Sequence, residues 1–388
     1  MFEKGIHLSS TIDLHNNHNV YILGAGFSRL NGLPLINDFM LRMRDALEYH
    51  AQRGHRRECD AIKDVLEFRL NASSAAYRVQ IDLENIEELF SLASASPTPI
   101  EENIRVAIAA TLDFCGQSGP DRVAEFRAPD YVYIDKANWS CSASQTLPPE
   151  WHWRAPAYEY IVNGMLGNSQ GLAGKLENTF ITFNYDQIIE NALTGLGVAY
   201  DLGLDGDSKS NNGTETRLLK LHGSMNWALP KRARSIVQVF DDYRQVIDAG
   251  LTPHLVPPTW KKDSAGSFTS IWRHALKALT DATRVVIVGF SMPPTDMHFK
   301  YLLATGLQKN YSLREIVFVS PGEGLSLVKS RCESLFAGNL QIGSQLRFVD
   351  STIEAFMGQG TLQQRVWSIS RPLPESVQGL SFGVGGQL

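Results

Sequence analysis

The sequence predicts an α/β fold in which a doubly wound parallel sheet is interrupted by a mostly helical insertion. One apolar run of strand length stands at 20–23. Four more follow after residue 179, with helical patterns between them. Parallel strands need crossover connections, which are usually helices, so this alternation indicates a parallel sheet. The first strand is expected to join the later ones, which makes the segment between them an insertion.

The elements of the first half follow from their apolar patterns. Strand 20–23 turns at Gly24–Gly26 into a short segment that ends at Gly32-Leu33-Pro34. Asp82 is placed to cap the first turn of a helix. Apolar stripes at helical spacing predict helices over 36–53, 58–70 and 82–92, one after Pro99, and one over 157–166.

In the second half of the chain, short apolar runs alternate with helical patterns, as expected for a buried parallel sheet. The signal between 117 and 156 is weak, and the chain after Met357 is rich in Gly, Ser and Gln. Short apolar runs predict strands at 180–183, 217–221, 285–288 and 316–319, and the patterns between them predict helices at 187–195, 268–281, 296–308 and 323–335.

Composition excludes several classes of protein. With 388 residues, 43% of them apolar and 20% charged, the chain can bury a full core. A net charge of −5 gives no electrostatic reason to expect direct nucleic-acid binding. No apolar run reaches membrane-spanning length, and the segment 1–19 is too polar for a signal peptide. We therefore expect a cytoplasmic protein that does not enter a membrane.

The cysteines do not indicate a metal site. The four are widely scattered and include no C-x-x-C pair, so a structural zinc ribbon is not expected. His15 and His18 lie three residues apart, but no Cys or further His stands close by in the sequence. We find no metal-ligand cluster from spacing alone.

A glycine turn follows the first strand, in the segment Gly24-Ala25-Gly26-Phe27-Ser28. Such a turn can aim bare backbone N–H groups at a diphosphate. The segment lacks the third glycine of the full dinucleotide fingerprint, so a tight turn without a ligand fits the pattern equally well. Ser28 could bond a phosphate oxygen or cap the following turn.

Polar side chains follow two of the later strands. For Asp186 alone, an N-cap of the next helix is the simpler interpretation. Asn184 is poorly suited to a buried strand, yet its amide can hold both a ribose hydroxyl and a water. His222 precedes Gly223, which leaves the imidazole room to approach a ligand, and its ordinary pKa near 6.5 suits a proton acceptor. A structural histidine is the alternative.

A second strand–glycine–helix turn stands at 289–296. Pro293 and Pro294 stiffen it, and Thr295 or Asp296 is expected to cap the next helix. Gly289 and Ser291 could contact the adenine end of a nucleotide. At the carboxyl edge of an open parallel sheet, these turns and polar side chains predict chemistry on a nucleotide.

These segments together resemble the sirtuin superfamily, and more closely its bacterial NAD-hydrolysing branch, the sirtuin-like domains of antiphage defence. GAGFS at 24–28 with Gly32-Leu33-Pro34 looks like the family's GAGxS…GIP segment. TFNYD at 182–186 looks like its TQNID, Leu221-His222-Gly223 like its catalytic HG, and Gly289-Phe290-Ser291 like its GTS-type loop. The matches span about 20–320 in the right order.

The departures from the family pattern concern the acyl-peptide groove. The four-Cys zinc module of deacetylating sirtuins is absent, and the Asp-Phe-Arg that follows their GIP is replaced by Leu35-Ile36-Asn37. The Gln of TQNID is Phe183. These differences argue against protein deacetylation, and the helical insertion looks like that of the defence enzymes.

The resemblance implies a Rossmann-like NAD-binding domain formed by 1–35 and 176–358, a helical insertion at 36–175 and a C-terminal tail at 359–388. It implies NAD+ as substrate, cleaved to nicotinamide and ADP-ribose, with Asn184, His222 and Asp186 as catalytic residues and no zinc. An NAD-dependent deacylase or ADP-ribosyltransferase, and a non-catalytic NAD or ADP-ribose sensor, are the alternatives. The residues expected to hold NAD+ are Gly24, Ala25, Gly26, Phe27, Ser28, Gly289, Phe290, Ser291 and Ser320.

The resemblance also implies partners. An unregulated NAD-consuming enzyme would kill its host, so control by assembly or by a second protein is expected. The family suggests a homo-oligomer. A HerA-type hexameric ATPase is the leading candidate partner, because no appended sensor domain is recognisable in the chain.

Overall fold

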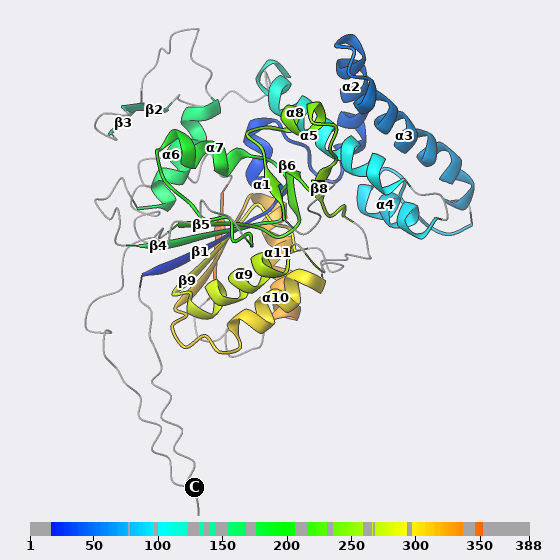
Figure 1. The fold of residues 1–388 in the computed structure, drawn as a ribbon. Helices are drawn as coiled ribbons and strands as arrows, with labels where there is room; N and C mark the ends of the chain where they lie inside the picture. The colour runs from blue at the N-terminus through cyan, green and yellow to red at the C-terminus, as the bar shows by residue number, and fades with distance from the viewer. Residues whose placement is uncertain are drawn as a thin grey trace, which may run out of the picture.

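The computed structural model in Figure 1 shows a central sheet with helices on both faces and a helical lobe beside it. The C-terminal tail 359–388 and the turn at 293–296 lie outside the described residues. The structure describes residues 17–76, 78–96, 100–122, 132–135, 140–143, 154–167, 176–205, 216–230, 236–258, 266, 268–292, 297–336 and 346–351.

The central sheet has six parallel strands in the order β11-β10-β9-β1-β4-β5. Read from β5 and numbered along the chain, this order is 3-2-1-4-5-6, that of the Rossmann dinucleotide-binding fold. The predicted doubly wound parallel sheet is therefore confirmed. The strands are β1 (His18–Leu23), β4 (Glu177–Thr182), β5 (Thr216–Lys220), β9 (Arg284–Val288), β10 (Glu315–Ser320) and β11 (Leu346–Asp350).

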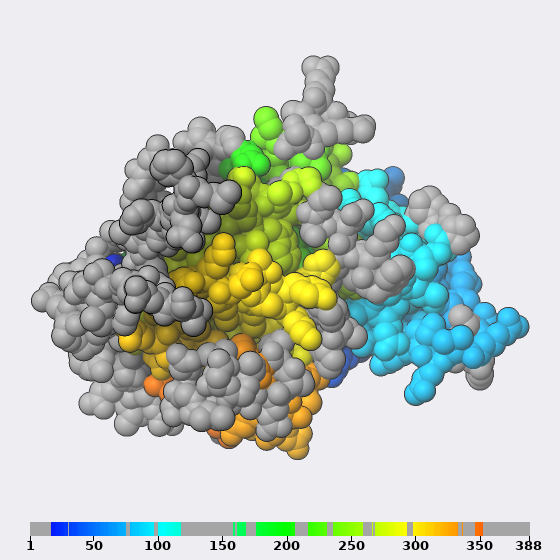
Figure 2. Space-filling view, turned by 90° about the horizontal axis from the view of Figure 1, so that it is seen from below, coloured from blue at the N-terminus to red at the C-terminus, as the bar shows by residue number. Residues whose placement is uncertain are grey.

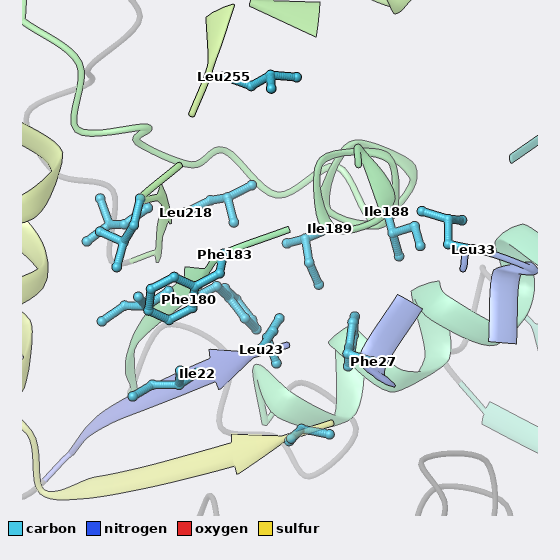
Figure 3. Close-up of a cluster of buried hydrophobic side chains, with 14 of the residues drawn as sticks. Ile22, Leu23, Phe27, Leu33, Phe180, Phe183, Ile188, Ile189, Leu218 and Leu255 are labelled. Carbon is cyan, nitrogen blue, oxygen red and sulfur yellow. The ribbon is translucent and has the colours of Figure 1, made fainter. Parts of the chain in front are cut away.

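The strand β1 lies at the centre of the sheet, and all six of its residues are buried. In register, Tyr21 stands between Phe180 of β4 and Val286 of β9. Figure 3 shows apolar side chains of β1 and β4, among them Leu23 and Phe180, packed beneath Ile189. This core fixes the carboxyl ends of β1 and β4 relative to one another.

Helices cover both faces of the sheet. In Figure 1, α6 and α7 lie on one side and α9 and α10 on the other. The helix α9 contacts β1 and β5, and α11 contacts β10 and β11. These helices are α6 (Arg154–Met165), α7 (Ile188–Gly195), α9 (Thr269–Asp281), α10 (Met297–Leu307) and α11 (Gly322–Leu335).

The chain between β1 and β4 carries the helical lobe, which Figure 2 shows in blue and cyan beside the yellow α10. The helix α5 packs against both α2 and α3. The glycine turn itself forms α1 (Ala25–Ser28) and a 3-10 turn, Arg29–Asn31. The lobe and the rest of this segment contain α2 (Phe39–Gln52), α3 (Arg56–Ala76), α4 (Ile86–Ala95), α5 (Glu101–Arg122) and a hairpin of β2 (Val132–Asp135) and β3 (Ser140–Ala143).

The predicted start of a helix at Asp82 needs correction, although the Asp82 carboxylate does accept from the Glu84 N–H as expected. The helix α4 begins at Ile86, and its N-cap is Asn85, whose Oδ1 accepts a hydrogen bond from the Glu87 N–H at 2.9 Å. Asp82 instead closes the preceding turn by accepting from the Glu84 N–H at 3.0 Å. Both residues are good capping types, and only the course of the chain decides between them.

A small antiparallel sheet follows β5 and was not predicted. Its central strand β6 (Gly223–Ala228) begins directly after His222, and it pairs with β7 (Gln238–Val239) and β8 (Pro253–Leu255). The helix α8 (Tyr243–Asp248) contacts both β6 and β8. This unit joins the end of β5 to the helical lobe, because β8 also contacts α5.

Among the described residues, we find no helix that is both long enough and apolar enough to cross a bilayer.

Candidate active site

The two glycine turns meet at the point where the strand order reverses, between β1 and β9. Gly24 N–H donates to the Val288 carbonyl at 3.0 Å, and Gly26 N–H donates to the Gly289 carbonyl at 2.9 Å. A Cβ on Gly24 would stand 2.5 Å from the Gly289 oxygen, and one on Gly289, where φ is +60°, would stand 2.3 Å from the Phe27 nitrogen. The glycines are therefore required for the two turns to pack together.

This packing corrects one expectation from the sequence. The N–H groups of Gly24, Gly26 and Phe27 all donate to backbone carbonyls, so they are not bare donors waiting for a diphosphate. Contact between the two turns could not be read from spacing, because they lie more than 260 residues apart in the chain. The turn from β1 still lies at the crevice where Rossmann folds bind dinucleotides.

Gly24→Ala is expected to lower the free energy of unfolding by about 1–3 kcal/mol, because the new methyl group overlaps the backbone of the 289 turn. Urea unfolding measures the change. Gly116→Ala in α5 is the matched control, since a Cβ there meets no described heavy atom within 4 Å. Equal stability of the two variants would contradict the close approach.

A chain of hydrogen bonds connects the ends of β1 and β4. The Asn184 Nδ2 group donates to the Gly24 carbonyl and to Ser28 Oγ, both at 2.9 Å. Ser28 Oγ in turn donates to Asp186 Oδ2 at 2.6 Å. Because an amide nitrogen carries two hydrogens, these bonds use both, and the Asn184 carbonyl oxygen is the group it can offer to a ligand.

Asp186 performs two tasks at once. Its Oδ1 accepts from the Ile188 N–H at 3.0 Å, but the N-cap of α7 is Gln187, so the predicted cap at Asp186 lies one residue too early. Its Oδ2 accepts from Ser28. Ser28 is buried, and Asn184 and Asp186 are half-buried. The three side chains therefore hold the turn after β1 against the turn after β4.

His222 is buried at the end of β5, with 6% of its surface exposed. Its ring meets the edge of Phe183, with ring centroids 5.1 Å apart, and its carbonyl accepts from the Val256 N–H at 2.9 Å. Phe183 directly precedes Asn184 in the chain. The imidazole at the end of β5 and the amide at the end of β4 therefore lie at the same sheet edge, and Phe183 contacts the imidazole.

The glycine after His222 has a packing role that the sequence did not reveal. Gly223 has φ +79°, and a Cβ there would stand 2.2 Å from the His254 carbonyl oxygen and 3.0 Å from Phe268. The glycine is therefore required where β6 packs against β8 and the start of α9, and the room predicted beside the imidazole stays a prediction.

An aromatic group covers the other side of Phe183. Phe290 stacks on Phe183 with centroids 5.3 Å apart, and Phe299 of α10 contacts both rings. Phe183 and Phe299 were not among the predicted site residues. An apolar ring at the position where sirtuins carry Gln was the available signal for Phe183.

Lys220 is a further residue that the sequence did not reveal. It is fully buried, and its ammonium donates to Glu190 Oε1 and to Ser224 Oγ, both at 2.6 Å, and to the Asp186 carbonyl. Burial raises the pKa of Glu190, and the positive charge of Lys220 opposes that shift. This buried pair anchors the turn that carries Asn184 to both α7 and β6.

The remaining predicted residues lie along the β9 and β10 end of the same edge. The Gly289 N–H donates to the Val319 carbonyl at 3.2 Å. Ser291 is exposed, and its carbonyl accepts from Arg331. Ser320 is half-buried at the end of β10. These contacts do not test whether the residues hold NAD+, so that assignment stays a prediction.

Burial, with a smaller contribution from Arg105, lowers the pKa of His254 to about 4, against an ordinary value near 6.5. Between these values the unfolded chain binds a proton that the folded chain does not, so stability should fall as pH drops through this window. The expected loss is about 3 kcal/mol at most.

His254→Phe keeps the ring that stacks on Phe268 and removes the titration. Urea unfolding at about pH 7.5 and about pH 4.5 should show a smaller loss for this variant than for the wild type. Equal losses would rule out His254 as a source of the acid sensitivity.

A set of side chains that could bind a metal ion lies in the helical lobe, although the spacing of residues in the sequence indicated none. His50, His55 and Glu58, in the helical lobe, are brought together by the fold. The spacing did not reveal them because His50 and His55 are five residues apart and the third member is a carboxylate.

Comparison with known proteins points to one family. A family model described as SIR2-like domain matches residues 178–339, which is less than half of the chain. The matched part runs from β4 to just beyond α11 and contains Asn184, His222 and Gly289, but not the Gly24 turn. Comparison with curated proteins found no match.

The solved structures that the chain resembles include several forms of Sir2. A complex of Sir2 with the inhibitor EX-527, 2′-O-acetyl-ADP-ribose and a deacetylated p53 peptide is 12% identical, with 90% of this chain and 93% of the other covered and a TM-score of 0.35. Sir2 bound to an acetylated peptide and a Sir2–p53 peptide–NAD+ complex are each 12% identical, with 91% and 93% covered and TM-scores of 0.36. Likenesses this weak do not by themselves establish a shared fold.

Proposed function

We propose that the chain is an NAD+ glycohydrolase that cleaves NAD+ to nicotinamide and ADP-ribose. The observation that carries the proposal is the Asn184–Ser28–Asp186 chain of hydrogen bonds beside His222, at the carboxyl edge of a sheet in Rossmann order. The SIR2-like match over 178–339 and the motif resemblance to NAD-hydrolysing sirtuin-like domains support the same chemistry.

The reaction suits these groups. Nicotinamide is a cationic leaving group on the anomeric carbon of the ribose, so the bond to it breaks through an oxocarbenium-like transition state. The bonding electrons pass to the nicotinamide nitrogen, and a water oxygen then bonds to the sugar carbon. In this proposal the Asn184 carbonyl oxygen orients the ribose and the water, and His222 accepts the proton that the water loses.

Burial should favour the reaction. His222 has little exposed surface, and Phe183 and Phe290 present apolar rings beside it. An apolar wall excludes stray water and strengthens each electrostatic contact with the developing cation. Asp186 contributes by holding Ser28, which in turn holds the Asn184 amide, and so acts as a positioning residue.

Two other functions use the same site. An NAD-dependent deacylase or ADP-ribosyltransferase would pass the sugar to an acceptor instead of water, and it would need a groove for that acceptor. A non-catalytic sensor would bind NAD+ or ADP-ribose and signal by assembly. The absence of a four-Cys module from the sequence disfavours the first alternative.

Asn184→Ala is expected to reduce NAD+ cleavage by at least about 100-fold, because the ribose loses the group that orients it. The measurement is the time course of NAD+ loss and nicotinamide release by the purified full chain. Urea unfolding of the same variant checks that it folds, and Asn178→Ala, which removes a buried amide from the opposite end of β4, is the control. NAD+ that binds but persists with the wild-type chain would favour the sensor.

We further propose that the activity is an antiphage defence function controlled by assembly, with NAD+ depleted in infected cells. A homo-oligomer is the first expectation and a HerA-type hexameric ATPase is the proposed partner, both from the motif resemblance. Gel filtration of the full chain, alone and mixed with the protein encoded beside it, tests both. A monomer that ignores that protein and cleaves NAD+ at full rate would contradict this form of control.

A further inference from the structure

A cluster of polar side chains is buried in the helical lobe, and none of its residues belongs to the NAD+ site proposed above. His50 lies in the last turn of α2, His55 in the turn that follows, and Glu58 in the first turn of α3. One ligand atom from each lies within 4.8 Å of the others. His50 and Glu58 are buried, with 0% and 1% of their surface exposed, and His55 is half-buried.

The hydrogen positions on the two rings satisfy the contact between them in one arrangement only, with His55 Nδ1–H donating to His50 Nδ1. His50 Nε2 lies 3.0 Å from the Ala110 carbonyl, which can only accept, so this nitrogen carries the hydrogen. In the neutral ring His50 Nδ1 is then a bare lone pair, and it lies 2.9 Å from His55 Nδ1.

Arg244 of α8 brings a further donor close to the same His55 nitrogen. Its Nη1 lies 3.4 Å from His55 Nδ1 and can only donate. If His55 Nδ1 carries a hydrogen to serve His50, that hydrogen faces a guanidinium donor. If it carries none, the two Nδ1 lone pairs face each other. A cation between the two nitrogens removes the contact between their lone pairs, and it lies beside the Arg244 guanidinium, whose charge Glu58 offsets.

The separation of the nitrogens fits a shared metal ion. Zinc–nitrogen bonds of about 2.0–2.1 Å place two ligand nitrogens about 2.9–3.4 Å apart for bond angles between a right angle and a tetrahedral one. The observed 2.9 Å falls at the short end of that range. Ala110 holds the His50 ring as a backbone carbonyl holds many metal-bound histidines.

Charges of both signs surround the cluster. Arg244 pairs with Oε1 of Glu58, which leaves the second carboxylate oxygen for a ligand. Asp248 stands 3.8 Å from the same guanidinium, and Asp113 interacts electrostatically with it. Arg53 and Arg57 add positive charge near His55 and Tyr243, so the carboxylate that the site depends on is Glu58.

Two buried polar atoms point to the same conclusion. The hydroxyl of Tyr243, a residue only 1% exposed, finds no hydrogen-bond partner among the described residues, and neither does Asp113 Oδ2. Tyr243 interacts electrostatically with Glu58, Asp113 and Arg244, which places it in the cluster. Buried polar groups without partners are rare in folded proteins and indicate a missing water or ion.

We propose that His50, His55 and Glu58 form a site for a divalent metal ion, with zinc as the ion that two imidazoles and a carboxylate favour. The ion ties the α2–α3 turn to α8, because Arg244 holds the ligating carboxylate from that helix. Since α8 contacts β6 and β8, the site fastens the helical lobe to the unit that begins after His222. It is a structural site, distinct from the sheet edge.

The test uses the full chain freed of metal with a chelator, then titrated with Zn²⁺ by calorimetry, with bound zinc counted by mass spectrometry. We expect one zinc per chain and a rise in melting temperature with zinc. His55→Gln and Glu58→Gln should weaken binding at least about tenfold and abolish the thermal shift. His274→Gln, which removes an imidazole from α9, is the matched control and should bind zinc as the wild type does.

Circular dichroism of the metal-free variants shows whether they fold. His55 is only half-buried, so we expect His55→Gln to fold. Zinc binding by this variant can then be measured even if Glu58→Gln unfolds. Failure of the wild type to bind zinc, or zinc retained in full by His55→Gln, would overturn the site and leave a buried polar cluster. Thiolate-to-cobalt charge-transfer bands in the near-ultraviolet spectrum of the Co²⁺ form would overturn the ligand set in favour of the neighbouring Cys59. None of these readouts depends on NAD+ cleavage.

Discussion

His222→Phe is expected to lower the rate of NAD+ cleavage by about 10²- to 10⁴-fold, the usual loss when a general base is removed. Phenylalanine keeps a ring beside Phe183, so the packing at the end of β5 is retained while the proton acceptor is lost. The loss should appear in kcat more than in KM, because the imidazole acts on the water in the transition state.

His274→Gln serves as the control for imidazole removal, since His274 stands on α9. The melting temperatures of both variants show whether either has lost its fold. A His222→Phe chain that folds and still consumes NAD+ at the wild-type rate would remove His222 from the mechanism and leave Asn184 to act without it.

Lys220→Met is expected to lower the free energy of unfolding by about 3–5 kcal/mol, because it leaves Glu190 buried without its counter-charge. The substitution also removes the donor that holds Ser224 and the Asp186 carbonyl. Urea unfolding measures the loss. The turn that carries Asn184 should loosen as well, so NAD+ cleavage should fall even where the variant remains folded.

The double variant Lys220→Met/Glu190→Leu separates the ion pair from the packing. Replacing both charges with apolar groups often recovers most of the stability lost by removing one. We expect the double variant to be more stable than Lys220→Met alone. If Lys220→Met unfolds within about 1 kcal/mol of the wild type, the buried pair does not anchor this turn.

The sheet could be predicted from the sequence because its strands are continuous apolar runs. The runs at 20–23 and 285–288 fall within β1 and β9, and the alternation with helices gave the parallel topology. The last strand, β11, was missed because its residues are mostly half-buried and carry no such run. The strand β6 was missed because Gly223–Ala228 mixes polar and apolar residues.

The site could be predicted in part only. Asn184 and His222 stood out as polar residues at strand ends. Their connection through Ser28 and Phe183 depends on the strand order, which spacing along the chain does not determine. The role of Lys220 was not predicted, because it stands within the apolar run of β5 and the sequence does not show that Glu190 lies beside it.

The most direct test of the central claim is NAD+ cleavage by the purified full chain in water enriched in ¹⁸O, followed by mass spectrometry of the products. The proposed reaction predicts free nicotinamide and ADP-ribose that carries one ¹⁸O atom from the solvent at the sugar carbon. It also predicts that Asn184→Ala yields neither product. NAD+ that remains intact in the presence of the wild-type chain, with and without the protein encoded beside it, would contradict the account.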